Sequence, residues 1–72
     1  TDMINIYPNP VNANSEIHLG TECDNVEIYN ALGVKIAEYE NVNHIDGIET
    51  SGIYMIKIVE QGNVRFNRIV VK

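Results

Sequence analysis

Short stretches in which apolar and polar residues alternate recur along the whole chain, separated by residues that favour turns. They lie at residues 4–7, 16–20, 26–29, 34–36, 43–46, 52–60 and 64–72. No segment repeats apolar positions with helical spacing over three turns, so the pattern predicts strands. About seven short strands with closely spaced turns are typical of a small antiparallel β-sandwich, and an all-β fold of this class is expected.

Residue types assign several of the turns. In "NALG", Asn30 suits the first position of a type I turn and Gly33 suits the left-handed position after it, which predicts a hairpin with a glycine bulge. Gly62 in "QGN" predicts a second tight turn. Pro8 and Pro10 cannot donate to a strand ladder, so their segment is expected at a strand end or a sheet edge. The stretch "VNANS" that follows is interpreted as a polar loop.

The stretch Gly52–Glu60 is the longest apolar run, and it is apolar on both faces of the predicted strand. A strand of this kind is expected in the interior of a sheet. One face carries Tyr54, Ile56 and Ile58, and the other carries Ile53, Met55 and Val59.

The phase of the last stretch stays open. One phase turns Phe66 and Arg68 toward the core, and the other turns Ile69 and Val71 toward it. A bulge near Asn67 would let Phe66 and Ile69 face the core together.

Composition fits one small folded domain, with 72 residues, 44% hydrophobic and 21% charged. A chain of this length buries only about 60% of the surface of its unfolded form, so its stability is expected to be modest. The single cysteine, Cys23, cannot form an intrachain disulfide and is expected to be half-buried beside a turn. Its neighbours Glu22 and Asp24 oppose formation of a reactive thiolate.

Charge is distributed unevenly. The net charge of −5 argues against nucleic acid as a partner. Residues 1–50 hold nine acidic residues and the single base Lys35, whereas residues 51–72 hold the acid Glu60 and four bases. The basic strands either lie beside acidic strands and neutralise them or form a separate recognition surface, and both alternatives stay open.

No catalytic or metal-binding constellation emerges from the residue spacing. His18 and His44 lie in separate predicted strands without a ligand-spaced partner, and a zinc site needs several converging ligands. Ser15 and Ser51 sit in turn-rich loops without the context of a nucleophile. The sequence therefore predicts a protein that is not an enzyme and that requires no cofactor and no metal.

Four motifs, in this order, carry a resemblance to a known family: "INIYPNP", "VEIYNALGVKI", "GIYMIKI" and "RIVVK". The chain resembles the type A C-terminal sorting domains of cargo proteins of the type IX secretion system. Lysine is usual in the family where Arg68 stands, and Ile48 fills the place of a customary leucine in a loop that is one residue shorter. The matching residues are Tyr7, Pro8, Asn9 and Pro10, then Val26, Ile28, Tyr29, Asn30 and Gly33, then Gly52, Tyr54, Ile56 and Ile58, and finally Arg68, Ile69, Val70, Val71 and Lys72.

This resemblance implies an immunoglobulin-like sandwich that serves as an export signal. Residues 1–72 would be the last domain of a larger secreted cargo, and the start at Thr1 rather than Met suits a piece of a longer protein. The domain would transit the periplasm, be recognised by outer-membrane translocon and shuttle components, and be removed at the cell surface by a sortase-like protease.

The five residues from Arg68 to Lys72 are the predicted recognition element. As the last strand they could offer an open edge to a receptor, serve only as a core strand, or do both. Self-association through sheet edges is a further expectation, opposed by the positive charge. Two rival functions are a carbohydrate- or surface-binding accessory module of a secreted hydrolase and a structural spacer.

Overall fold

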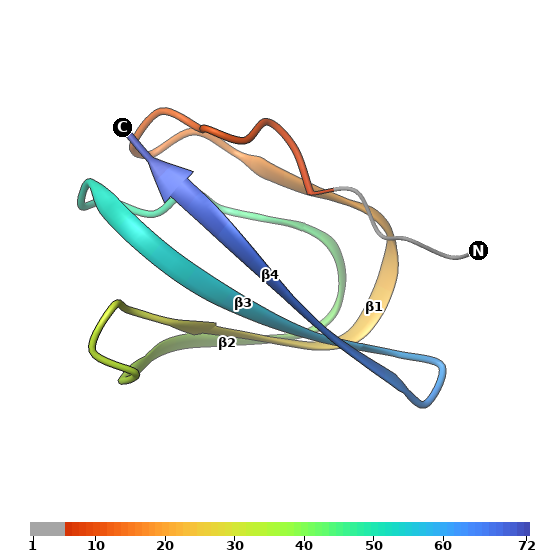
Figure 1. Cartoon of the computed structure of the whole chain (residues 1–72). Helices are drawn as coiled ribbons and strands as arrows, with labels where there is room; N and C mark the ends of the chain where they lie inside the picture. Colours follow the sequence, from red (N-terminus) through yellow and green to blue (C-terminus); the bar gives the residue numbers. More distant parts are fainter. Residues whose placement is uncertain (1–5) are drawn as a thin grey trace.

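The computed structural model describes residues 6–72, which form four antiparallel strands in one sheet (Figure 1). The strands are β1 (Ile17–Tyr29), β2 (Lys35–Ile45), β3 (Gly52–Glu60) and β4 (Asn63–Val71). Their order across the sheet is β2-β1-β3-β4, so β3 is an interior strand, as its two apolar faces predict. The expected all-β class is confirmed. Among the described residues, no helix is both long and apolar enough to span a bilayer.

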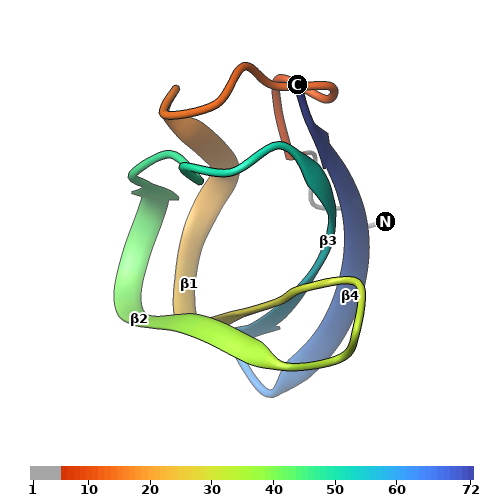
Figure 2. The ribbon, with the colours of Figure 1, turned by 90° about the vertical axis from the view of Figure 1, so that its left-hand side faces the viewer.

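A bend inside β1 explains much of the difference in strand count. The predicted segments 16–20 and 26–29 both belong to this strand, which stays paired with β2 on either side of the bend. The register shifts between His18 and Cys23, and Gly20 there adopts a φ of 82°. Glycine reaches this left-handed conformation without the steric cost of a side chain. The sheet therefore turns without ending the strand, and its four strands curl around an interior (Figure 2).

The strand β2 also joins two predicted segments, residues 34–36 and 43–46. A register shift between Ile28 and Tyr29 adds one residue to β2, so that Ala37 lies opposite Ile28 and packs against the core. Val34 and Ile36 remain about half exposed. Because of the bulge, Ala37 faces the core, whereas Val34 and Ile36 of the alternating stretch 34–36 do not reach it.

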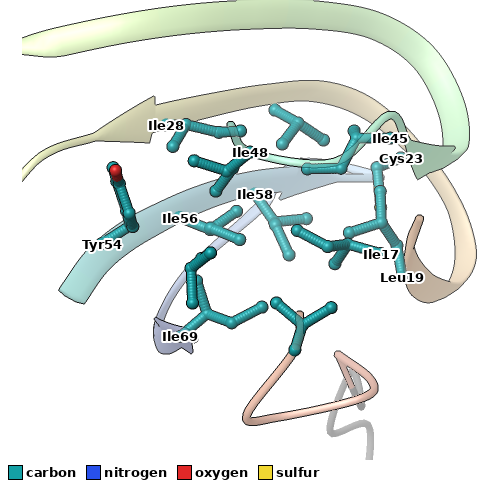
Figure 3. Close-up of a cluster of buried hydrophobic side chains, with 13 residues drawn as sticks. Ile17, Leu19, Cys23, Ile28, Ile45, Ile48, Tyr54, Ile56, Ile58 and Ile69 are labelled. Atoms are coloured by element: carbon teal, nitrogen blue, oxygen red, sulfur yellow. The ribbon is translucent and has the colours of Figure 1, made fainter. Parts of the chain in front are cut away.

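One hydrophobic cluster fills the interior of the curled sheet (Figure 3). Ile56 and Ile58 of β3 are fully buried opposite Ile28 and Val26 of β1, and Tyr54 joins them, which confirms the predicted inner face of β3. Full burial of such a side chain contributes roughly 1.5–3 kcal/mol. The other members of the cluster are Val11, Ile17, Leu19, Cys23, Ile45, Ile48, Ile69 and Val71.

Segments 6–16 and 46–51, which form no named strand, cover one end of the curled sheet (Figure 2). Val11 is only 1% exposed and Ile48 only 8%, so both complete the core. The backbone N–H of Asn14 donates to the carbonyl of Ile48 at 2.8 Å and ties the two segments together. The interpretation of residues 11–15 as a purely polar loop is therefore wrong at Val11.

The described residues thus hold four strands in one sheet instead of about seven in a two-sheet sandwich. Some turn-like residues lie at bends within strands. Gly20 in β1 and Asn41 in β2 both adopt positive φ without ending their strands. The predicted strand at residues 4–7 appears as a single bridge between Tyr7 and His18. Ile4 and Asn5 of that stretch lie outside the described residues.

The structure fixes the phase of β4. This strand pairs with β3 in unbroken register from Asn63 to Val71, without a bulge near Asn67. Gln61 and Gly62 form a two-residue turn with φ values of 49° and 82°, the geometry of a type I′ hairpin, which sets the register. Ile69 and Val71 consequently face the core, while Phe66 and Arg68 face outward.

Candidate functional site

The second half of β4 is lined along its outer edge by the segment Asn9–Ala13, so segments about 60 residues apart in the sequence lie side by side (Figure 1). Val11 runs parallel to β4: its N–H donates to the carbonyl of Val70 at 2.9 Å, and its carbonyl accepts from Lys72 at 2.7 Å. The N–H of Ala13 donates to the carbonyl of Lys72 at 3.0 Å. These bonds occupy backbone groups that an added strand would need.

The side chain of Asn9 extends this pairing beyond Val11. Its Nδ2 donates to the carbonyl of Arg68 at 3.1 Å, and its Oδ1 accepts from the N–H of Val70 at 3.1 Å. One asparagine side chain thus replaces a stretch of backbone, next to Pro8 and Pro10, which lack N–H donors. The prediction that residues 68–72 offer an open edge to a receptor does not hold in the folded chain.

The five predicted recognition residues divide by face. Ile69 and Val71 are 0% and 2% exposed and belong to the core, so their side chains cannot be contacted while the domain is folded. Arg68 and Lys72 are exposed and Val70 is half-buried. The side chains available to a partner are therefore the two charged ones and, between them, one edge of an aliphatic residue.

The turn after β1 is built by Asn30 and Gly33. The Asn30 side chain accepts hydrogen bonds from the N–H groups of Leu32 and Val34 at 2.9 and 3.0 Å, and its carbonyl accepts from Gly33. Gly33 has a φ of 85°, and no heavy atom lies within 4 Å of the position of an added Cβ. The predicted type I turn with a glycine bulge is confirmed, and Gly33 serves the backbone conformation.

Gly52 and Tyr54 form a second local unit, at the start of β3. The Tyr54 ring lies 3.6 Å from the position that a Cβ on Gly52 would take, and its hydroxyl donates to the carbonyl of Thr50 at 2.7 Å. A Cβ there would make only ordinary contact with the ring, so the φ of 154° at Gly52 is what favours glycine. Tyr7, from the first motif, is half exposed and stacks on His18 with ring centroids 5.1 Å apart.

Three of the four sequence motifs meet at one open hollow of about 470 Å³. Tyr29 of β1, Met55 of β3 and Arg68 of β4 stand in one cross-strand row, because Tyr29 pairs with Met55 and Met55 with Arg68. The turn at Asn30 and Gly33 forms part of the wall, together with Ala31, Ile53 and Tyr54. Arg68 is the single charged residue of this lining.

Beside the hollow, a network of charged groups covers the outer face of β1 and β2. Lys35 bonds Glu38 at 2.9 Å and approaches Glu27 at 3.7 Å. Hydrogen bonds from Asn25 and Lys35 lower the pKa of Glu38, and the bond to Glu38 raises the pKa of Lys35.

The carboxylate of Glu27 also accepts a 2.6 Å hydrogen bond from Tyr29, which raises the pKa of that hydroxyl, and lies 3.8 Å from Lys57. Of the bases in residues 51–72, Lys57 therefore lies beside an acid of the neighbouring strand β1, as one of the two charge alternatives predicts. Arg68 differs, since no carboxylate of residues 6–72 lies within 4.0 Å of it.

The histidines and the cysteine lie elsewhere. His18 and His44 pair across β1 and β2, and both approach the carboxylate of Glu16, at 3.6 and 3.2 Å. Residues 6–72 contain no group of three or more residues placed to hold a metal.

Cys23 is fully buried rather than half-buried. Burial, and then the charges of Glu60, Asp24 and Glu22, raise the pKa of its thiol.

Sequence reasoning missed two residues that position the site. Val11 supplies the backbone that pairs with β4, and its only signal was an apolar residue standing alone in a polar stretch. Gly47 lies so close to Asn14 and Ser15 that a Cβ there would fall within 3.0 Å of their backbone atoms. The pair Asp46-Gly47 is a turn signal that marks such a close approach.

Comparison with known proteins adds two findings. The family model described as "Secretion system C-terminal sorting domain" matches residues 5–72. A solved structure of PorZ, whose title calls it an essential bacterial surface component of the type-IX secretion system of Porphyromonas gingivalis, is similar to 96% of this chain with a TM-score of 0.71 and 19% identity. The chain spans 11% of the length of that protein. No curated protein matches the chain.

Proposed function

Because the chain belongs to the family of secretion system C-terminal sorting domains, we propose that it directs a larger cargo protein across the outer membrane by the type IX secretion system. The observation that carries this proposal is the family match, which covers residues 5–72 and therefore the whole described fold. The domain would be the last one of its cargo and would act as an address without catalysis.

Recognition would rest on the outward side chains of β4. Arg68 of β4 and Lys72, which directly follows β4, are both exposed, and the strand is bonded to β3 on one side and to Asn9–Ala13 on the other. Both charges are therefore presented from a backbone that is held in place. Complementary charge favours the encounter of the domain with a receptor and its correct orientation there, as a sorting signal requires.

The route and the partners follow from this role. The domain would reach the periplasm with its cargo, bind outer-membrane shuttle and translocon components, and bring the cargo to the cell surface or the medium. A sortase-like protease would then remove it. Self-association would use β2 or the residues 63–67 of β4, because Asn9–Ala13 covers the remaining edge of β4.

The test is to fuse residues 1–72 to the C-terminus of an exported reporter in a bacterium that has a type IX system. The reporter should reach the cell surface, whereas the same reporter without the domain should remain in the periplasm. Periplasmic retention of a correctly folded fusion would refute the sorting function. The accessory-module alternative makes a different prediction, since the activity of the natural cargo on its substrate would then fall when residues 1–72 are deleted.

A further inference from the structure

The hollow beside Arg68 combines an apolar lining with one positive charge that has no carboxylate partner among residues 6–72. Tyr29, Ile53 and Met55 contribute apolar surface, and Met55 and Ile53 are 40% and 50% exposed. When another apolar group covers large apolar side chains that are exposed in a concave site, the free energy of binding becomes more favourable. The lining includes no carboxylate, although the chain as a whole carries a net charge of −5.

Charge pairing separates Arg68 from Lys35 and Lys57, two other bases of the outer face. Lys35 and Lys57 both lie within 4.0 Å of Glu27, so their charges are already matched within the chain. The Arg68 side chain has no such acid among residues 6–72, while its carbonyl is fixed by Asn9. A guanidinium that extends from a fixed backbone beside an apolar surface is suited to a carboxylate whose neighbouring atoms are apolar.

A second, smaller hollow of about 210 Å³ continues the first along the turn after β1. The two share Asn30, Ala31, Ile53 and Tyr54, and the second adds Leu32, which is 87% exposed. Together they form one groove, into which alternate side chains of one extended segment can point, because residues i and i+2 of such a segment share a face.

We propose that this groove binds an extended segment of the export receptor that places a large apolar side chain in the hollow and a carboxylate against Arg68. The inference rests on the proposed sorting function and specifies the chemistry of the partner. Charge complementarity selects the occupant, because the site itself supplies the cation and the apolar wall and lacks only the anion. A second copy of the chain is the competing occupant.

The first test uses two capped tripeptides as probes, acetyl-Phe-Ala-Glu-amide and its neutral twin acetyl-Phe-Ala-Gln-amide, titrated into the isotope-labelled 72-residue chain. The acidic peptide should shift the backbone amide resonances of Tyr29, Met55 and Arg68. It should bind about two- to fivefold more tightly than the neutral peptide, the range expected of one exposed ion pair.

The variant Arg68→Gln should abolish this preference, and the matched control Lys57→Gln, on the same outer face but outside the hollow, should keep it. Absence of shifts with millimolar peptide, or a preference that survives Arg68→Gln, would overturn the proposal. Sedimentation that shows a concentration-dependent dimer, lost in Met55→Gln, would overturn it in favour of the second copy.

The reporter fusion separates this inference from the sorting function. Arg68→Gln and Met55→Gln, both at exposed positions, should melt like the parent and deliver several-fold less reporter to the surface, while Lys57→Gln delivers a normal amount. If the parent domain delivers the reporter and both hollow variants deliver it equally well, the groove is not the docking site and the sorting function stands. If the parent domain fails to deliver it, the sorting function itself is wrong.

Discussion

Asn9 and Val70, separated by 61 positions in the sequence, are joined by a hydrogen bond of 3.1 Å from the backbone N–H of Val70 to the side-chain Oδ1 of Asn9. The Nδ2 of the same Asn9 side chain donates to the carbonyl of Arg68. The first and last family motifs are thus one structural unit, in which the side chain from one motif completes the edge of the strand from the other.

We expect Asn9→Ala to lower the free energy of unfolding by about 1–2 kcal/mol, because two hydrogen bonds are lost at an exposed site where water replaces part of each. The amide of Val70 should also exchange its hydrogen faster than it does in the parent. Chemical denaturation and hydrogen exchange measure the two effects. The control Asn12→Ala, at an exposed position of the same segment, should change neither. Unchanged exchange at Val70 would contradict the assigned bond.

Gly47 should tolerate no side chain, because a Cβ there would meet the backbone of Asn14 and Ser15. Gly47→Ala must push the two closing segments apart, and an overpacked interior of this kind costs about 1–3 kcal/mol. The contrast is Gly33→Ala, which meets no neighbouring atom and should cost about 1–2 kcal/mol from its left-handed backbone alone.

Thermal melting of both variants checks this comparison, and nuclear magnetic resonance spectra locate the damage. Gly47→Ala should disturb the resonances of Val11 and Ile48, whereas Gly33→Ala should disturb only the turn after β1. Equal and purely local changes in the two variants would show that the close approach at Gly47 relaxes freely.

Burial of Cys23 should make its thiol inert and the stability of the fold sensitive to alkali. Its folded pKa is raised above that of the unfolded thiol, about 8.5, so its contribution is complete below that pH and is lost as pH rises toward the folded value. Ellman's reagent should label Cys23 only in denaturant, and the alkaline loss of stability should be smaller in Cys23→Val. Rapid labelling of the native chain would contradict the buried position.

Much of the fold follows from local pattern. The turns at Asn30–Gly33 and at Gly62, the interior position of β3 and the inner face of Tyr54, Ile56 and Ile58 were all predicted, since each depends on residues adjacent in sequence. The number of strands was not. Gly20 and Asn41 resemble loop residues in sequence, and only the continuing pairing of β1 with β2 makes them bends within strands.

The site was predicted as a set of residues and not as an arrangement. The motifs named Asn9, Tyr29 and Arg68, but the hydrogen bond from Asn9 to β4 and the hollow beside Arg68 depend on the cross-strand register. The register of β4 was ambiguous because Phe66 and Ile69 are both strongly apolar, and the burial that decides between them is a tertiary property.

The exposed charges of β4 should be required for export and not for folding. Arg68 and Lys72 contribute backbone groups to the pairing with Asn9–Ala13, and those groups are unchanged by substitution of the side chains. We therefore expect Arg68→Glu combined with Lys72→Glu to melt within a few degrees of the parent and to leave a reporter fusion in the periplasm. Reversed charges repel the partner that the native charges attract.

Exchange of the two bases, Arg68→Lys with Lys72→Arg, is the matched control. It keeps both positive charges and should deliver the reporter to the surface as the parent does. A double mutant that melts and exports normally would exclude a role of these charges in recognition, and one that loses both fold and export would assign them to stability alone.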